Sequence, residues 1–535
     1  MRDPAAVTDR REAASGSTPP VMDAGAAFHD PGLAGGHRAS RPAFVYGSLA
    51  LAVAAVFVPM SLLRFVDADE GAYLLVSRLV VEGRVLYHDF FYPQMYLMPY
   101  LYGSWMLLFG YSWYAARVLS ALLCIGLSLL VCRQVTLHTA SRAWGVGAAL
   151  LLAASGFVFG WYPLVKAYAP ATLLIFGAYA LLSTRLRWRW AASGLLLGLA
   201  VACRVYVVGV VPAFLLALHL TERDGRARLT QLARFTVAFL VTLLPAGWLF
   251  AVDPETFVFN IVGNQIMRDQ AFPMPETGGW WTQKTRPALA LFGLLGTATA
   301  TTRQFVFLVL PCVAAWLACV RARRPLPLAS LIAICLFAAS HVPTPVYGQY
   351  FCMLVPFLLV DAVTFVATVV REDTTSRMRY LVAVGIVAYV LMSPADVYRY
   401  TVTAELIEGH ANPDDWRIPT VRAVGQAVDR HLRPGRPFAI TFWPGYLVET
   451  RAAMLPGMEN HFALYYANHL PPRQVARFRL MSVSELISHL RTGDVDVVAV
   501  GNRTPNRDAL RDQLRQNRFV VTETIAGAEI FTRSR

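Results

Sequence analysis

Residues 43–73 read AFVYGSLALAVAAVFVPMSLLRFVDADEGAY, an apolar run followed within a few residues by three carboxylates. The run 43–63 carries no charged residue and is about as long as a helix that crosses a bilayer. The end of this predicted membrane helix is therefore followed closely by three acids, Asp67, Asp69 and Glu70. Charge at such a place is energetically costly unless it has a role. This junction predicts a membrane protein with chemistry at the membrane surface.

The apolar character extends over most of the chain. Of the 535 residues, 56% are hydrophobic and 15% are charged, and the mean hydropathy is +0.45. One soluble core could not hide so much apolar surface, so the composition indicates a polytopic α-helical membrane protein. The net charge of +14 does not indicate a nucleic-acid partner, because many arginines sit at the ends of apolar segments instead of gathering on one polar face. The seven cysteines lie in or beside apolar segments, lack metal-ligand spacing and are expected to be small buried side chains.

About eleven membrane crossings are predicted from the apolar segments. They are 43–63, 112–132, 143–161, 167–183, two short helices within 190–220 that meet near Arg204, 232–251, 303–320, 326–341, 346–370 and 379–394. With the N-terminus in the cytoplasm, every short loop with an arginine cluster falls on the cytoplasmic side, as the positive-inside rule requires.

That topology divides the chain into three parts, and the protein is expected to be a multi-pass protein of the plasma (inner) membrane. Residues 1–42 are predicted to be a disordered cytoplasmic tail, and 43–394 a transmembrane domain with outer loops 64–111 and 252–302. Two shorter apolar pieces in those loops, 95–109 and 288–300, are expected to be helices at the membrane surface. Residues 395–535 should form an extracytoplasmic α/β domain, with candidate strands 437–442, 495–500 and 519–532 and helices 421–432 and 482–490.

The first outer loop concentrates acids, an imidazole and aromatic rings. It contains Asp69, Glu70 and Tyr73, continues through Arg84 to Tyr87-His88-Asp89, and then reads Tyr92-Pro93-Gln94. An acid here can take a proton from an attacking hydroxyl. The same acids can equally cap a helix over 71–81, because carboxylates favour helix N-termini, and the sequence leaves both interpretations open.

This loop resembles the first periplasmic loop of the GT-C superfamily of integral-membrane glycosyltransferases, in the protein-mannosyltransferase-like and aminoarabinose-transferase-like branch. In that branch an Asp-Glu-x-x-Tyr motif follows the first helix, and a Tyr-x-Asp and proline segment precedes a surface helix. The matching residues are Asp69, Glu70 and Tyr73, then Tyr87, Asp89 and Pro93. Gln349-Tyr350 resembles a later helix start of the branch, so the resemblance spans about 43–394.

The resemblance implies a sugar donor on a polyprenyl phosphate, a hexosyl or pentosyl transfer with inversion to a glycan, lipid or protein acceptor, and Asp69 as general base. Glu70 would be a substitute or orienting group. The leaving phosphate needs cations, for which Arg204 is the first choice and Lys166 the second. Arg204 could instead form an internal salt bridge or snorkel, and Lys166 could be an interface anchor. The other expected substrate contacts are Tyr73, Arg84, His88, Asp89, Gln349 and Tyr350.

One departure from the branch concerns a second acid, which many relatives carry before the helix that matches 167–183. This chain has Lys166 in that segment, so a metal that bridges two carboxylates is in doubt, although Asp89 could serve as the second acid. No cofactor is assigned as certain, and a divalent metal stays a possible one. Two rival functions stay open: a transporter or lipid flippase, and a non-catalytic protein that binds a lipid-linked sugar. No related halves of the kind found in transporters are visible.

Overall fold

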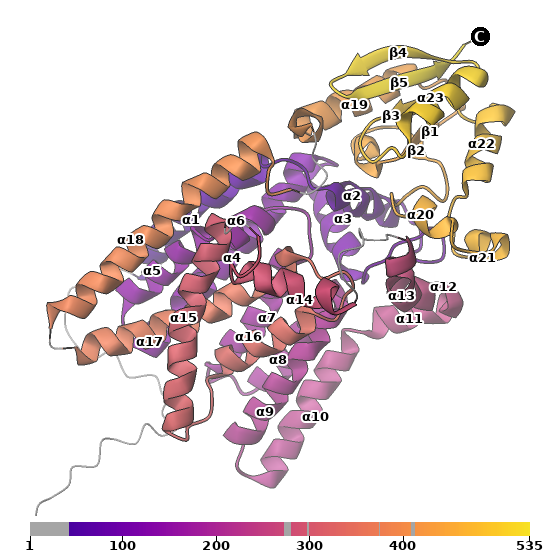
Figure 1. Ribbon diagram of the computed structural model, residues 1–535. Helices are drawn as coiled ribbons and strands as arrows, with labels where there is room; N and C mark the ends of the chain where they lie inside the picture. Colours follow the sequence, from indigo (N-terminus) through magenta and orange to yellow (C-terminus); the bar gives the residue numbers. More distant parts are fainter. Residues whose placement is uncertain (1–41, 272–279, 297–298, 374, 408–411, 535) are drawn as a thin grey trace, which may run out of the picture. The chain divides into compact units, whose positions relative to one another are not determined.

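The protein is seen here as a computed structural model that describes residues 42–271, 280–296, 299–373, 375–407 and 412–534 (Figure 1). Apart from its last residue, the predicted N-terminal tail lies outside the described residues. Helices account for most of residues 42–403, and a small sheet lies between Phe438 and Arg533. Residues 36–535 belong to one compact unit, within which all contacts below fall.

All eleven predicted crossings correspond to helical segments in the described part of the chain. Five are long and apolar enough to span a membrane, a sixth is a pair of helices bent by 43°, and five more are apolar helices of 10–17 residues. The long ones are α1 (Pro42–Leu63), α4 (Trp113–Thr139), α15 (Ala300–Arg321), η4 with α17 (Gly348–Leu354 and Val355–Glu372), and α18 with η5 (Ser376–Tyr398 and Arg399–Thr403). The bent pair is α10 (Gly225–Val241) with α11 (Leu244–Val252), and the shorter helices are α5 (Arg142–Ala153), α7 (Tyr168–Leu182), α8 (Arg189–Cys203), η2 with α9 (Val205–Val210 and Val211–Thr221) and α16 (Leu328–Ser340).

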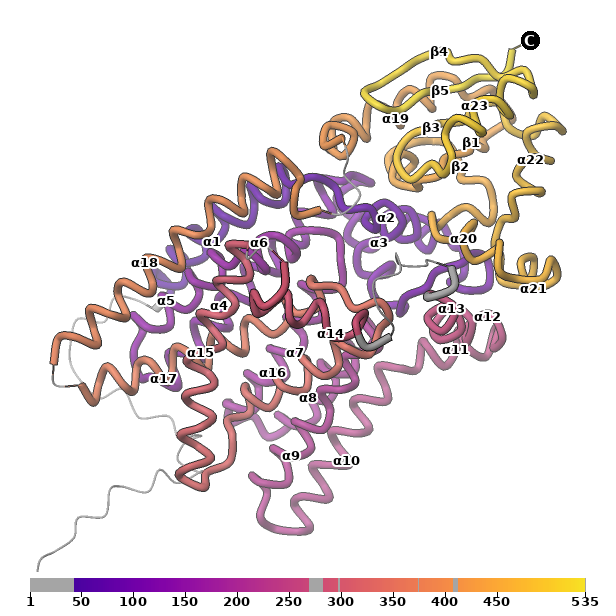
Figure 2. The backbone as a smooth tube through the Cα atoms, viewed as in Figure 1, coloured from indigo at the N-terminus to yellow at the C-terminus, as the bar shows by residue number. Residues whose placement is uncertain are grey.

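The long apolar stretch 190–220 divides at Arg204, as the sequence predicted. Arg204 has an extended backbone with φ −155° and ψ 111°, which ends α8. Pro212, one of the first two residues of α9, has no backbone N–H to donate and fits such a start. The trace in Figure 2 shows α8, α9 and α10 as neighbouring segments that pack together.

Short helices fill the two long loops. They are α2 (Ala68–Val81), α3 (Leu97–Phe109), α12 (Pro254–Val258), η3 (Phe259–Gly263), α13 (Asn264–Ala271) and α14 (Trp280–Leu291), while α6 (Gly156–Trp161) follows α5. The helix predicted at 95–109 is confirmed as α3. The one predicted at 288–300 is wrong in its bounds, because α14 ends at Leu291 and Gly293 and Gly296 adopt positive φ.

The C-terminal domain is α/β, as expected, with the strand order β2-β1-β3-β5-β4. The strands are β1 (Phe438–Thr441), β2 (Ala453–Met454), β3 (Val497–Val500), β4 (Phe519–Ile525) and β5 (Ala528–Arg533). β1 pairs in parallel with β2 and β3, whereas β5 is antiparallel to β3 and β4. The helical elements of this part are η6 (Pro413–Trp416), α19 (Ile418–His431), η7 (Pro444–Leu447), α20 (Ala463–Ala467), α21 (Pro472–Arg477), α22 (Val483–Thr492) and α23 (Arg507–Gln516). The boundary drawn at 394/395 falls inside α18, which continues past Pro394 to Tyr398.

The C-terminal domain packs closely on α2. Trp443 is fully buried, and its Nε1–H donates to the carbonyl of Ala68 at 2.7 Å. A Cβ at Gly71 would lie 2.5 Å from the Cα of Gly445, so the contact between α2 and η7 requires glycine. Arg78 donates from α2 to the carbonyl of Thr450 at 2.6 Å. These contacts fix the helix that carries the acidic cluster.

Candidate active site

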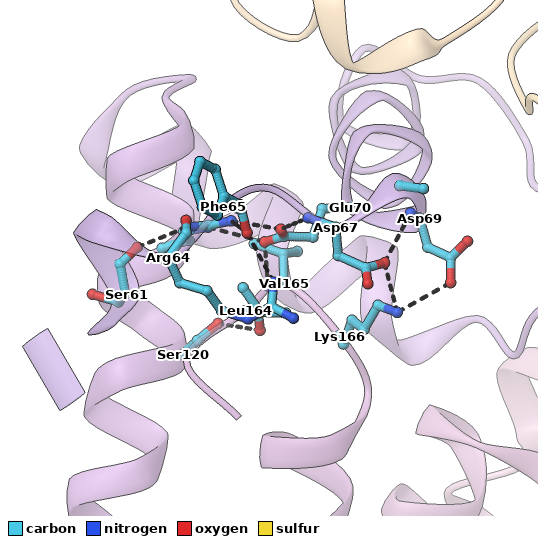
Figure 3. A network of polar contacts seen from close by, with 12 residues as sticks. Ser61, Arg64, Phe65, Asp67, Asp69, Glu70, Ser120, Leu164, Val165 and Lys166 are labelled. Atoms are coloured by element: carbon cyan, nitrogen blue, oxygen red, sulfur yellow. Dashed lines mark hydrogen bonds and ion pairs between the residues drawn. The ribbon is translucent and has the colours of Figure 1, made fainter. Parts of the chain in front are cut away.

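The three acids of the opening motif have different surroundings (Figure 3). Asp67 caps α2, and its Oδ1 accepts from the backbone N–H of Asp69 at 3.1 Å. Glu70 Oε2 accepts from the backbone N–H of Asp67 at 2.8 Å, which completes a capping box. The capping interpretation is therefore correct for Asp67 and Glu70. Asp69 is left with 31% of its side chain exposed.

Glu70 is buried in an ion pair and does not face a cavity. Arg117 of α4 reaches both of its oxygens, from Nε to Oε1 at 3.0 Å and from Nη2 to Oε2 at 2.6 Å. Both side chains are fully buried, and the backbone N–H of Val165 also donates to Oε1 at 3.0 Å. Both oxygens of Glu70 are thus engaged in holding α2 against α4, an arrangement that suits the expected orienting group better than a substitute base.

Lys166 joins the other two acids. Its Nζ lies 2.6 Å from Asp67 Oδ1 and 3.2 Å from Asp69 Oδ2, and only 4% of its side chain is exposed. Burial alone would lower the pKa of this ammonium, but Asp67 and Asp69 raise it above its usual value. Burial likewise would raise the pKa of Asp67, but Lys166 and Arg64 hold it well below its usual value. Lys166 is thus a charged bridge rather than a simple interface anchor.

His461 of the C-terminal domain lies on the other side of Asp69. Its Nε2 is 3.7 Å from Asp69 Oδ1, and only 2% of its side chain is exposed. Neither ring nitrogen has a hydrogen-bond partner among the described residues. Burial lowers the pKa of His461 to about 4, so the ring is neutral near pH 7.

Arg204 is held by aromatic rings. Its guanidinium carbon lies 4.8 Å from the ring centres of Tyr168 and Tyr206 and 4.7 Å from that of Tyr350. The internal salt bridge considered as an alternative is not seen among the described residues. Cation–π contacts satisfy the faces of a guanidinium and leave its N–H groups for a ligand such as phosphate.

These groups border one cavity of about 900 Å³. Asp69, Tyr73, Lys166, Arg204, Gln349 and Tyr350 line it, so six of the predicted site residues lie around a single space. Arg268, Arg286 and Arg503 add further positive charge to its walls, and Tyr347, Tyr465 and Tyr466 add rings. Asp67 lines the cavity as well, so the walls combine two carboxylates, of which Asp69 is the more exposed, with cations and aromatic side chains.

Three predicted substrate contacts, Arg84, His88 and Asp89, do not line this cavity. Arg84 pairs with Glu459 at 3.0 Å and donates to the carbonyl of Asp89 at 2.9 Å. The carboxylate of Asp89 accepts from the backbone N–H of Val85 at 2.6 Å. His88 lies 3.6 Å from Asp253 through Nδ1. The contacts of these three side chains lie within the first outer loop and join that loop to Glu459 and Asp253.

The acids do not form a metal site in the part of the chain that is described. It contains no group of three His, Cys, Asp or Glu side chains placed to hold an ion. Lys166 Nζ takes the position between Asp67 and Asp69 that a bridging cation would need. This donor set fits an ammonium better than a divalent metal.

Solved structures give the comparison with known proteins, since no family model and no curated protein matches this chain. ArnT from Cupriavidus metallidurans in the apo state aligns with a TM-score of 0.63 and 15% identity over 91% of this chain and 98% of that one. The fold is the GT-C fold. The same ArnT bound to undecaprenyl phosphate gives a TM-score of 0.63 at 15% identity over 91% of this chain and 97% of that one. The oligosaccharyltransferase of Archaeoglobus fulgidus, in complex with Zn and sulfate, gives 0.51 at 14% identity over 84% of this chain and 67% of that one.

Proposed function

We propose that this chain is a membrane glycosyltransferase that moves a sugar from a polyprenyl-phosphate donor to an acceptor hydroxyl. The observation that carries the proposal is one cavity bordered by a partly exposed carboxylate, Asp69, and by the cations Lys166 and Arg204. An inverting transfer needs a base for the incoming hydroxyl and positive charge for the leaving phosphate, and the cavity walls carry both.

Each group has one role in the proposed displacement. Asp69 takes the proton of the acceptor hydroxyl as its oxygen attacks the anomeric carbon. The bond between that carbon and the phosphate oxygen breaks, and the electron pair leaves with the polyprenyl phosphate. Arg204 stabilises the phosphate through its guanidinium N–H groups, and Lys166 holds the carboxylate of Asp69 in place through its contact with Oδ2.

The reaction is proposed for the extracytoplasmic face of the plasma (inner) membrane. The arginine clusters on alternate loops support a cytoplasmic N-terminus, and an odd number of crossings then puts residues 395–535 on the outer side. Membrane lipids would surround the helices and supply the donor laterally. A topology reporter fused after Arg535 tests this arrangement, and a cytoplasmic signal would contradict it.

The activity test uses the purified full chain with a panel of polyprenyl-phosphate pentoses and hexoses and a membrane extract as acceptor source. Release of polyprenyl phosphate and appearance of sugar on an acceptor are measured together. Asp69→Asn should slow both by about 10²- to 10⁴-fold, while Asp508→Asn, at a side chain that is 91% exposed, serves as the surface control.

The two rival functions give different outcomes in this assay. A flippase would move the sugar-lipid across a proteoliposome without forming a new glycosidic bond. A non-catalytic binder would retain the donor without releasing polyprenyl phosphate from it. Either result, with folded wild-type protein and every donor in the panel, would refute the proposed transfer.

A further inference from the structure

The C-terminal domain contributes a loop to the cavity, residues 455–462 between β2 and α20. Glu459 anchors this loop twice: Oε1 pairs with Arg84 of the first loop at 3.0 Å, and Oε2 accepts from the backbone N–H of Gly457 at 2.7 Å. Asn460 Oδ1 accepts from the backbone N–H of Phe462 at 2.9 Å. The result is a fixed loop that carries the buried ring of His461 to Asp69.

Charged groups surround the His461 ring on several sides. Asp69 and Asp67 come from the start of α2, Lys166 from the segment before α7, and Arg503 from the loop after β3. Burial outweighs the attraction of the two carboxylates, so the ring carries one N–H donor and one lone pair instead of a positive charge. Both ring nitrogens are buried without a hydrogen-bond partner among the described residues. Burying a polar atom in this way costs free energy, so such an atom in a folded protein calls for a functional explanation.

Asp69 has one oxygen for each neighbour. Oδ2 faces Lys166 Nζ at 3.2 Å, and Oδ1 faces His461 Nε2 at 3.7 Å. A hydrogen bond to a carboxylate has a length of about 2.8 Å, so the imidazole needs to approach by only about 1 Å. Contacts of this kind are often long in an empty site and shorten when the substrate is bound.

We propose that His461 is a positioning residue for Asp69, whose Oδ1 accepts from the His461 Nε2–H while Lys166 holds Oδ2. This inference rests on the proposed function, because it gives the base of that reaction a fixed orientation. Held from two sides, the carboxylate has one remaining direction for the acceptor hydroxyl, toward the cavity. The C-terminal domain is then part of the active site and not only its cover.

The test compares His461→Gln with His461→Asn, because the two amides differ in reach. The Gln amide can place its N–H near the position of Nε2, whereas the shorter Asn amide reaches only as far as Nδ1. His469→Asn is the matched control, because His469 lies on the same stretch and is exposed. The full chain is assayed with its best polyprenyl-phosphate sugar, and kcat, the donor KM and the pH profile of kcat/KM are measured.

Loss of one hydrogen bond to a charged group corresponds to about a tenfold to hundredfold fall in kcat for His461→Asn, with the donor KM within about twofold of the wild type. His461→Gln should keep kcat within about threefold. The acid limb of the His461→Asn profile should move to higher pH, because a carboxylate that loses a donor binds a proton more readily. A purely structural histidine would not separate Gln from Asn in this way.

Other results would overturn the inference. Full kcat in both variants would remove any role for His461, and equal losses with an unchanged pH profile would make the role structural. A wild-type protein that transfers no sugar from any donor would instead refute the proposed function, so the two failures are distinguishable.

Discussion

Replacing Lys166 with methionine will leave two neighbouring carboxylates without their shared cation. Methionine has a similar length and no charge, so the change removes the ammonium and preserves much of the packing. Asp67 is the acid most affected, because only 10% of its side chain is exposed and Lys166 Nζ lies 2.6 Å away. Asp69 is more exposed and can be hydrated.

The expected cost follows from this burial. Removal of one partner from a buried ion pair destabilises a protein by about 3–5 kcal/mol, because the other charge stays buried without compensation. Asp67 also loses the group that most strongly holds its pKa down, so the pKa of Asp67 will rise in the variant. Lys166→Met should therefore be least stable at high pH, and Lys166→Met/Asp67→Asn should recover much of the loss.

The assay is the unfolding midpoint of the purified chain, followed by tryptophan fluorescence at pH 5 and pH 8, for the wild type, both single variants and the double variant. A coupling free energy of about 2 kcal/mol or more between Lys166 and Asp67 is expected. Independent effects of the two substitutions, or a Lys166→Met protein as stable as the wild type at both pH values, would refute the reasoning.

Three further predictions concern other parts of the site. Glu70→Gln should lower the free energy of unfolding by about 3–5 kcal/mol, because it breaks the buried pair with Arg117. Glu82→Gln, at the C-cap of the same helix and with 42% of its side chain exposed, should cost less than about 1 kcal/mol. Equal effects in thermal unfolding would contradict the structural role of Glu70. Arg204→Leu should weaken the binding of polyprenyl phosphate about tenfold or more. The unfolding midpoint should not fall, because the guanidinium has no carboxylate partner among the described residues. Unchanged binding would exclude Arg204 from the phosphate site. Burial lowers the pKa of His461 from 6.5 to about 4, so the unfolded chain binds more protons than the folded chain in that pH range. The free energy of unfolding should therefore fall by about 3 kcal/mol as the pH drops from 6.5 to 4, and His461→Gln should lack this fall. The same pH dependence of stability in both proteins would contradict the prediction.

The helices and the small sheet could be predicted because their signals are local. Apolar length marks a crossing, and Asp67 with Glu70 three residues later marks a helix start. The break at Arg204 was also visible in the sequence. The bounds near 288–300 could not be predicted, because glycines with positive φ end α14 within an apolar run.

The pairing of charges could not be predicted because it depends on contacts between distant segments. Glu70 and Asp69 are adjacent in sequence, yet one meets Arg117 in the core and the other faces the cavity. His461 gives no local signal beyond its place in a loop between a strand and a helix. Lys166 does give a signal in the sequence. Of the 48 lysine and arginine residues in the chain only two are lysines, Lys166 and Lys284, and both are buried. A compact ammonium fits between two carboxylates where a guanidinium fork would not.

The most direct test of the central claim is the transfer rate of Asp69→Asn, measured beside its binding of polyprenyl phosphate. A general base contributes about 10²- to 10⁴-fold, so the rate should fall by that factor while binding stays within about twofold of the wild type. A variant that keeps the full wild-type rate would contradict the assignment of Asp69 as the base.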